Sequence, residues 1–494
     1  MVLHRRFFCL MLTLVMLFTV VSPVWAYDST TGAALAVEEI MDYIYQNHID
    51  KPEIDQLAEG AITGMLERVN DPYTEYLSED LLEEYKEMLD GDFVGVGIRL
   101  QDNGENPVVL DIIPDSPAAH ADIKPGDVIN KVDGEDVSGL MLDEVVARIR
   151  GPEGSDVTLI LRRDSQDVKV TLKRAPVSSP TVDYSKLSGD IGYIAIHSFG
   201  SQTAGEFARE LDRLNSEGVK GLILDLRDSP GGYLQAAVDI AGNFLKDDSL
   251  VLTTEDRDAH RDEYRTEGSP RWNGAPLVIL VNSLSASSSE VLAGALQDYG
   301  QAVLLGETTY GKGVVQSIIP LETGGALKLT TARYLTPKGR SIDGKGLEPD
   351  IRVLTRDLQL VRAKSVINAV PETVVKFKLN DNKASVNGEE IILQAAPFRK
   401  DGVVYLPLRF AMEALGYAVT WNNNNNSIEV KGTGENMQLF LNRPQAVFNG
   451  AGVSLKDAVT DVGGISFIPL DPNIPGVTMV DLGNEITLAK AGRK

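Results

Sequence analysis

Ser287 and Lys312 are the residues of this chain whose types and spacing point most directly to chemistry. Ser287 lies in the tract Ser-Ala-Ser-Ser-Ser-Glu at residues 285–290, and Lys312 lies between two glycines. A serine hydroxyl becomes a good nucleophile only when a base removes its proton, and a lysine can be that base only if its surroundings lower its pKa. The pair therefore predicts a serine hydrolase with a lysine base.

The serine tract also has a simpler structural interpretation. It precedes a helix predicted over about residues 288–296. Serine is favoured at helix starts, so Ser285 or Ser287 would cap this helix, and Glu290 completes a capping box if Ser287 is the cap. At the start of a helix, free backbone N–H groups also face the serine, where they would stabilise a developing oxyanion. From the residues alone, four candidate nucleophiles stay open: Ser285, Ser287, Ser288 and Ser289.

Lys312 has a competing interpretation as part of a phosphate loop. Residues 306–312 match the pattern Gly-x4-Gly-Lys. The next residue is Gly313, however, where such a loop needs serine or threonine to bind magnesium. The apolar run at residues 314–320 follows and would hold the ammonium group partly out of water. The pattern favours a base over a phosphate ligand.

Histidine offers a further alternative base. His48 lies among predicted helices and His120 in a strand-rich segment, whereas His197 ends a predicted strand and His260 lies in a charged segment. Triads are defined by geometry and not by order in the chain, so His197 or His260 stays open as a base. No serine of residues 178–360 lies in a Gly-x-Ser-x-Gly elbow.

An α/β core over residues 178–360 would position these side chains. Apolar runs predict buried strands with helices between them, and hence a mainly parallel sheet. The strands are expected at residues 191–196, 221–226, 277–281 and 302–305, and helices at 203–215 and 233–244. Active groups in such folds gather beyond the carboxyl ends of the strands. The turn at residues 228–232 follows one strand, and the serine tract follows another.

Three further regions surround this core, which makes the predicted fold class multidomain α+β. Residues 27–90 show helical spacing, with a turn and a new helix start predicted at Asp71-Pro72. Residues 91–177 show short strands, turns and one helix near 142–149, and resemble a PDZ domain, which binds peptide carboxyl termini by strand addition. The resemblance implies peptide contacts from Gly95, Val96, Gly97 and Ile98.

The last region, residues 374–494, contains an internal repeat. Asn387-Gly388 is matched by Asn449-Gly450, and residues 406–408 are matched by 468–470, both at an offset of 62 residues. Each half is predicted to hold hairpins and a short helix, and the asparagine run at 422–426 a hairpin loop. This β-rich region resembles the stalk domain named after the amino-terminal part of copper amine oxidases. It contains no histidine or cysteine, so no copper site is expected.

The amino-terminal residues and the charge predict an exported protein. Two arginines, a 15-residue apolar run and the ending Val-Trp-Ala fit a signal peptide at residues 1–26, which would act as a membrane anchor only if uncleaved. Cys9, the one cysteine, falls inside this segment, so no disulfide or zinc-thiolate site is expected. The formal net charge of −24 argues against nucleic acid as a partner.

Taken in order, the motifs resemble the carboxyl-terminal processing proteases over about residues 33–351. The resemblance rests on residues 225–232 (Asp-Leu-Arg-Asp-Ser-Pro-Gly-Gly), the serine tract, residues 311–316 (Gly-Lys-Gly-Val-Val-Gln) and residues 339–350. It implies that Ser287 is the nucleophile, that Lys312 is the base and that Gln316 orients it. An extended strand would separate Lys312 from Gln316 by about 13 Å, so the segment must bend if the two are to touch.

The same resemblance implies an oxyanion hole and a substrate class. The oxyanion donors would be the backbone N–H groups of Gly231, Gly232 and Ser288. This sequence departs from the family at Ser288, where alanine is usual, and at Leu284, where a small residue is common. The implied function is a serine endopeptidase that recognises protein carboxyl termini and needs no metal or cofactor. A homodimer and cell-wall association are further expectations, and a secreted scaffold that binds carboxyl termini without cleaving them is the alternative function.

Overall fold

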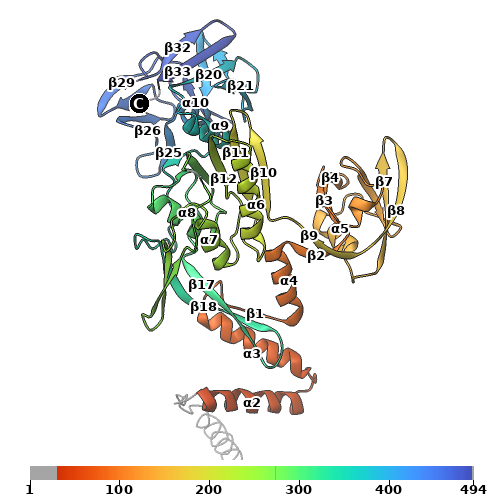
Figure 1. Cartoon of the computed structure of the whole chain (residues 1–494). Helices are drawn as coiled ribbons and strands as arrows, with labels where there is room; N and C mark the ends of the chain where they lie inside the picture. Colours follow the sequence, from red (N-terminus) through yellow and green to blue (C-terminus); the bar gives the residue numbers. More distant parts are fainter. Residues whose placement is uncertain (1–29, 273, 475, 492–494) are drawn as a thin grey trace, which may run out of the picture. The chain divides into compact units, whose positions relative to one another are not determined.

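The computed structural model describes residues 30–272, 274–474 and 476–491 (Figure 1). The predicted signal peptide lies outside the described residues. The chain forms two compact units, one of residues up to Ser78 together with Ser317–Thr330, and one of Glu79–Gln316 together with the residues from Thr331 onwards. Among the residues that the structure describes, no helix combines the length and apolar character needed to cross a bilayer.

The first unit consists of two helices and a small piece of sheet. Helices α2 (Thr30–Asn47) and α3 (Ile54–Val69) bury none of their residues fully. Strand β1 (Glu75–Leu77) pairs antiparallel with the first residues of β18 (Ala326–Leu335), with Glu75 opposite Lys328. The predicted helix start after Asp71 is therefore wrong. The carboxylate of Asp71 accepts hydrogen bonds from Tyr73 N (3.1 Å) and Thr74 Oγ1 (2.6 Å), which closes a turn that leads into a strand instead.

In the second unit, helix α4 (Glu79–Asp90) precedes the PDZ-like sheet. That sheet has the order β3-β4-β5-β7-β8, with β6 paired to β5. Its elements are β3 (Ile98–Gln101), β4 (Val108–Ile112), β5 (Val128–Val132), β6 (Glu135–Asp136), helix α5 (Leu142–Ile149), β7 (Asp156–Arg163) and β8 (Gln166–Lys173). A separate ladder pairs β2 (Asp92–Gly95) with β9 (Ala175–Ser178). The alternating residues Val157, Leu159 and Leu161 of β7 are fully buried, because one face of the sheet covers the core.

A six-stranded sheet forms the α/β core, in the order β10-β11-β12-β15-β16-β19. These strands are β10 (Val182–Leu187), β11 (Ile191–Ile196), β12 (Gly221–Asp225), β15 (Leu277–Val281), β16 (Val303–Gly306) and β19 (Ile351–Arg352). The ladder between β10 and β11 is antiparallel, and the other four are parallel. The prediction of a mainly parallel sheet is confirmed, since strands buried on both faces appear in a sequence as continuous apolar runs.

Helices cover both faces of this sheet. Leu222 and Leu224 of β12 pack in one cluster with α6 (Thr203–Ser216), α7 (Leu234–Ala241) and α8 (Ser288–Asp298). Ile223, between them, faces the opposite way and packs in a second cluster with α9 (Arg356–Ile367). A second, smaller sheet contains β18, β13 (Leu250–Asp256), β14 (Arg261–Arg265) and β17 (Val314–Pro320). Successive residues of β12 face opposite sides of the six-stranded sheet. On the side of Ile223, helix α9 belongs to the same apolar cluster as the carboxyl-terminal region.

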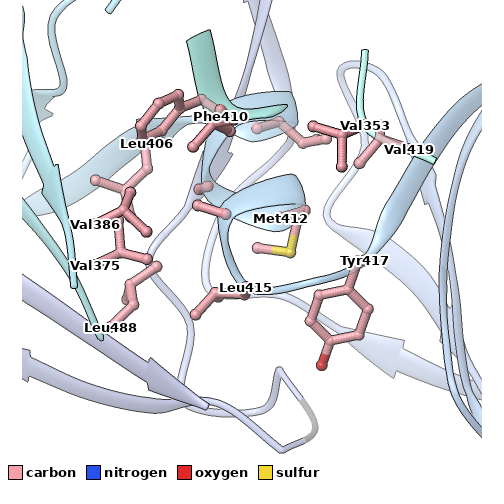
Figure 2. Close-up of a cluster of buried hydrophobic side chains, with 14 of the residues drawn as sticks. Val353, Val375, Val386, Leu406, Phe410, Met412, Leu415, Tyr417, Val419 and Leu488 are labelled. Carbon is pink, nitrogen blue, oxygen red and sulfur yellow. The ribbon is translucent and has the colours of Figure 1, made fainter. Parts of the chain in front are cut away.

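The carboxyl-terminal region consists of three antiparallel sheets around α10 (Leu408–Ala414). Figure 2 shows Val375, Val386 and Leu488 on one side of this helix and Val419 and Tyr417 on the other. The strands are β20 (Glu372–Lys378), β21 (Lys383–Val386), β22 (Glu389–Ile392), β23 (Phe398–Lys400), β24 (Val403–Pro407), β25 (Ala418–Asn422), β26 (Ser427–Gly432), β27 (Glu435–Phe440), β28 (Gln445–Phe448), β29 (Ala451–Ser454), β30 (Thr460–Val462), β31 (Ile465–Pro469), β32 (Thr478–Asp481) and β33 (Glu485–Ala491).

The internal repeat is visible in the hydrogen bonds. Asn387 exchanges two bonds with Val374, and Asn449 exchanges the same two with Asn436. The matched segments pair with each other, since Leu406 lies opposite Ile468. The prediction of a helix in the second half is wrong, because the described residues after β31 form turns in a segment that contains Pro472. The fold class is confirmed, and the domain boundaries stay predictions.

Candidate active site

Ser287 lies at a strained turn between β15 and α8. Its backbone has φ 54° and ψ −118°, and it is the residue immediately before the first turn of α8. A positive φ is rare for a residue with a side chain and costs of order 1–3 kcal/mol. Such strain persists where the surrounding contacts impose it, and it concentrates at functional sites. The turn therefore marks Ser287 as a candidate nucleophile independently of the sequence motif.

The other serines of the tract are occupied in the fold. Ser285 Oγ donates to the carbonyl of Leu226 at 2.7 Å. Ser288 Oγ donates to the carbonyl of Gly232 at 2.9 Å, and Ser289 Oγ donates to Ser229 O at 3.0 Å. All three are buried, whereas Ser287 is half-buried. The geometry favours Ser287 among the four hydroxyls, and it gives the unusual Ser288 a role in linking two turns.

Glu290 joins the serine tract to the lysine loop. Its fully buried carboxylate accepts backbone N–H groups from Ser287 (3.0 Å), Gly311 (2.8 Å) and Lys312 (2.9 Å), and also the hydroxyl of Thr309. Ser287 and Lys312 donate to the same oxygen, so their nitrogens lie within ~6 Å of each other, the length of two hydrogen bonds. Burial raises the pKa of Glu290, while the four donors oppose that rise.

Sequence reasoning assigned Glu290 only to the helix cap. The bond from Ser287 N is that predicted contact, but the other three donors come from residues 309–312. A Ser-x-x-Glu motif indicates a cap locally and carries no information on a loop 19 residues further along. The burial of the carboxylate, which the sequence does not show, is the property that identifies its second role.

We expect Glu290→Gln to lower the free energy of unfolding by about 2–3 kcal/mol, because the amide turns an NH₂ group towards backbone donors and leaves them unpaired. Peptidase activity should fall with it, since the two turns lose their common acceptor. Urea denaturation and a cleavage assay measure both effects. Glu267→Gln, at an exposed position, is the matched control. Unchanged stability of the Glu290→Gln protein would contradict the bridging role.

The glycines around Lys312 allow a close approach of another loop. A Cβ atom at Gly311 would lie 2.8 Å from the backbone nitrogen of Gly346, and one at Gly313 would lie 2.6 Å from that of Asp343. Gly344 N donates to Gly311 O at 2.8 Å. Lys312, half-buried, is thus held on a backbone that packs tightly against residues 343–346.

The phosphate-loop interpretation of Lys312 does not fit this geometry. The N–H groups of Gly311 and Lys312, which would face a phosphate, donate to the carboxylate of Glu290. A strand, β17, follows the lysine, whereas a phosphate loop continues into a helix. Lys312 and Gly313 precede that strand, so the segment from Lys312 to Gln316 lies only partly in it. Gln316 is the third residue of β17 and is half-buried.

The predicted oxyanion residues lie against the nucleophile. Gly231 has φ 91°, and a Cβ atom there would lie 2.8 Å from Ser288 N and 2.9 Å from Ser287 Cβ. Gly232 has φ 153°, and its Cβ would lie 2.4 Å from the carbonyl oxygen of Phe199. Only glycine fits both positions. The structure thus brings Gly231, Gly232 and Ser288 together beside Ser287. Leu284, three residues before Ser287 in the chain, is exposed.

A charged network holds the loop that carries these glycines. Arg227 donates to Asp225 through Nε at 2.9 Å, and Tyr193 Oη donates to the same carboxylate at 2.8 Å. Asp228 pairs with Arg356 at 2.6 Å, and this guanidinium lowers the pKa of Asp228. The network ties the loop to β11 and to the start of α9.

The histidines have other surroundings. His197 Nε2 lies 2.7 Å from Asp183 Oδ2, which lowers the pKa of Asp183. His260 lies between β13 and β14, where its backbone N–H donates to Asp256 at 2.8 Å. Both side chains are exposed. Within the part of the chain that the structure describes, neither histidine forms a hydrogen bond or ion pair with Ser287, so the geometry gives no support to a histidine base.

The predicted peptide contacts lie where β2 passes into β3. Gly97 has φ 79°, and Ser116 packs so closely that a Cβ atom there would lie 2.1 Å from Ser116 Cβ. Val96 is buried, and its carbonyl accepts the N–H of Ala118 at 2.8 Å. Because β3 is the terminal strand of its sheet, it has an edge to which a peptide can add.

Comparisons with known proteins cover each of these regions. Residues 190–353 match the model of peptidase family S41, residues 108–163 that of a PDZ domain, and residues 27–81 that of the activating protease CtpB N-terminal domain. Residues 362–429 and 385–472 match the copper amine oxidase N-terminal domain.

Several proteins are similar over most of the chain. A probable CtpA-like serine protease of Staphylococcus aureus (strain N315) is 36% identical over 366 residues, which cover 74% of this chain and 72% of that protein. One of Staphylococcus haemolyticus is 36% identical over 360 residues, covering 72% and 71%. A solved photosystem II D1 C-terminal processing protease is 30% identical, covers 66% of this chain and 94% of its own, and has a TM-score of 0.41.

Proposed function

The chain belongs to the carboxyl-terminal processing proteases of peptidase family S41 and is a serine peptidase, and from that premise we propose that Ser287 is its nucleophile and Lys312 its base. The observation that supports the proposal is the buried carboxylate of Glu290, which binds the backbone of both residues through one oxygen. The strained turn at Ser287 and the occupied hydroxyls of the neighbouring serines point to the same nucleophile.

The proposed reaction proceeds through an acyl-enzyme. The neutral amine of Lys312 accepts the proton of Ser287 Oγ as this oxygen attacks the carbonyl carbon of the scissile peptide bond. Backbone N–H groups of the Gly231-Gly232 turn and of Ser288 stabilise the negative charge on the carbonyl oxygen. The lysine ammonium then gives its proton to the leaving amine. Water hydrolyses the ester, and Gln316 is proposed to orient the lysine amine.

The PDZ domain is proposed to select substrates by their carboxyl termini. Its open edge at β3 would take the terminal segment as an added strand, and the backbone from Gly95 to Ile98 would bind the carboxylate. A secreted scaffold that binds carboxyl termini without cleaving them was the alternative. Membership in a peptidase family gives it no support.

Mass spectrometry of a peptide substrate tests this function. We expect new termini from a peptide that ends in apolar residues with a free carboxylate, and roughly tenfold slower cleavage of its amidated counterpart, which lacks the charge of the carboxylate. Equal rates for the two peptides would contradict recognition of the carboxyl terminus. Binding without any new terminus would contradict the catalytic assignment.

We also propose that the protein is exported and associates with the cell wall. The signal-like residues 1–26 and the acidic composition support export, and the resemblance of residues 374–494 to stalk domains supports wall association. Fractionation of the native culture tests both. Recovery of the protein only from the cytoplasm would contradict export, and failure to sediment with isolated walls would contradict the second proposal.

A homodimer is proposed through α2 and α3. No described residue of either helix is fully buried, and large apolar side chains are exposed along them, namely Leu35, Ile40, Tyr43, Met65 and Val69. Apolar faces of this extent commonly mark protein interfaces. We expect light scattering to give the mass of a dimer for the mature chain and of a monomer for Ile40→Glu, with Glu39→Gln as the control. A monomeric parent chain would contradict the proposal.

A further inference from the structure

A hollow of about 660 Å³ lies in the second unit, apart from the turns that carry Ser287 and Lys312. Its walls come from the starts of α9 and α10, from β25, from the end of β22 and from the beginning of β31. The volume is in the range of pockets that bind small molecules or peptide side chains. No step of the proposed reaction uses this hollow.

The hollow has an apolar floor and an apolar rim. Leu408, Phe410 and Val419 line it and are buried, and Figure 2 shows the last two at the edge of the core around α10. Ile392 and Trp421 also line it, but they are 54% and 45% exposed. Large apolar side chains that stay in water beside such a floor favour a partner that covers them.

Strand β25 supplies a sheet edge at the hollow, which Arg409 covers at Val419 and beyond which no strand of the described residues pairs. It is the terminal strand of its sheet and pairs with β26. The carbonyl of Val419 accepts a hydrogen bond from Arg409 Nη1 at 2.8 Å, so the polar backbone groups of Val419 point away from β26. Orientation alternates along a strand, and therefore those of Trp421, two residues on, point the same way. An extended peptide can add to such an edge.

Charge on the rim favours an acidic occupant. Arg356 and Arg409 line the hollow, and their side chains are 55% and 44% exposed although each has an ion-pair partner. Asp357 is the one carboxylate among the described lining residues. Arg356 donates to both oxygens of Asp228, and Arg409 donates to Glu413 and to the carbonyl of Val419. A guanidinium group carries five N–H donors, so two acceptors do not exhaust it.

We propose that this hollow is a second peptide-binding site, which takes an extended polypeptide segment that carries apolar side chains and an acidic residue. An apolar floor beside the edge of a terminal strand suits such a segment better than a glycan, whose hydroxyl groups need many polar partners. Arg356 also binds Asp228, three residues before Gly231, so the site adjoins the loop of the proposed oxyanion hole. A role of this site in holding unfolded substrates for cleavage rests on the proposed function. The binding of a peptide to the site does not rest on it.

Fluorescence anisotropy on the full mature chain with Ser287→Ala tests the site without cleavage. The probe is a fluorescein-labelled peptide of alternating leucine and glutamate with an amidated end, so that the PDZ domain has no carboxylate to bind. We expect saturable binding, weakened about tenfold by Trp421→Ala because the variant removes a large aromatic contact. Leu482→Ala, exposed in the same region but outside the hollow, should bind as the parent does. Thermal unfolding checks that the variants fold.

Altered probes separate the two parts of the recognition. Methylation of alternate backbone nitrogens should weaken binding if the peptide adds to β25, and glutamine in place of glutamate should weaken it if the arginines bind the acid. The absence of saturable binding, or equal affinity of the Trp421→Ala protein, would overturn the proposal. The proposal would also be overturned if the protein bound a wall oligosaccharide and not the peptide, and if Trp421→Ala abolished that binding. Loss of the peptidase assignment alone would leave these results unchanged.

Discussion

We expect the Ser287→Ala protein to fold and to bind peptide carboxyl termini while its kcat/KM for cleavage falls by roughly 10⁵–10⁶-fold, the scale on which a serine peptidase loses activity without its nucleophile. Alanine retains the Cβ that packs against Gly231, so the turn should survive the loss of the hydroxyl. Quantification of new termini by mass spectrometry gives the rate, and thermal unfolding reports the fold.

Ser288→Ala is the matched control for this prediction. It removes a hydroxyl from the neighbouring residue but keeps the backbone N–H that is proposed to face the oxyanion. Its bond to the carbonyl of Gly232 would be lost, at a cost of about 1 kcal/mol in the free energy of unfolding. We expect activity close to that of the parent chain. If Ser287→Ala stays active, or if only Ser288→Ala is inactive, the nucleophile has been assigned to the wrong serine.

Much of the α/β core was predictable because its strands carry their signal locally. Residues 277–281 are apolar throughout, and the strand β15 has those bounds. Residues 221–226 were predicted as a strand, and β12 ends one residue earlier. Strands that are buried on both faces appear as unbroken apolar runs, so no tertiary information is needed to find them.

The arrangement around the site was less predictable, because it depends on contacts between distant segments. Glu290 has the sequence signal of a capping residue, and its link to Gly311 and Lys312 follows from how the loop after β16 folds over α8. The fit of Gly313 against Asp343 is likewise a packing fact. At Asp71, the predicted turn is present, but a strand and not a helix follows it, because Glu75–Leu77 pair with β18.

Replacement of Lys312 by arginine should abolish cleavage nearly as completely as replacement by alanine. Arginine keeps the positive charge and a long side chain, but it is always protonated and has no lone pair that can accept the proton of Ser287. A role in charge or packing alone would survive Lys312→Arg. Lys345→Arg, on the exposed loop that packs against Gly311, is the matched control and should retain activity.

The pH dependence of kcat/KM for the parent chain is an independent test of Lys312 as the base. An ordinary solvated lysine is almost wholly protonated at neutral pH, and only the neutral amine can accept the proton of Ser287. Therefore kcat/KM should rise with pH and level off once the amine is deprotonated. Two results would contradict Lys312 as the base. One is a pH profile that follows the titration of a histidine and is lost in His197→Ala or His260→Ala. The other is an active Lys312→Arg protein.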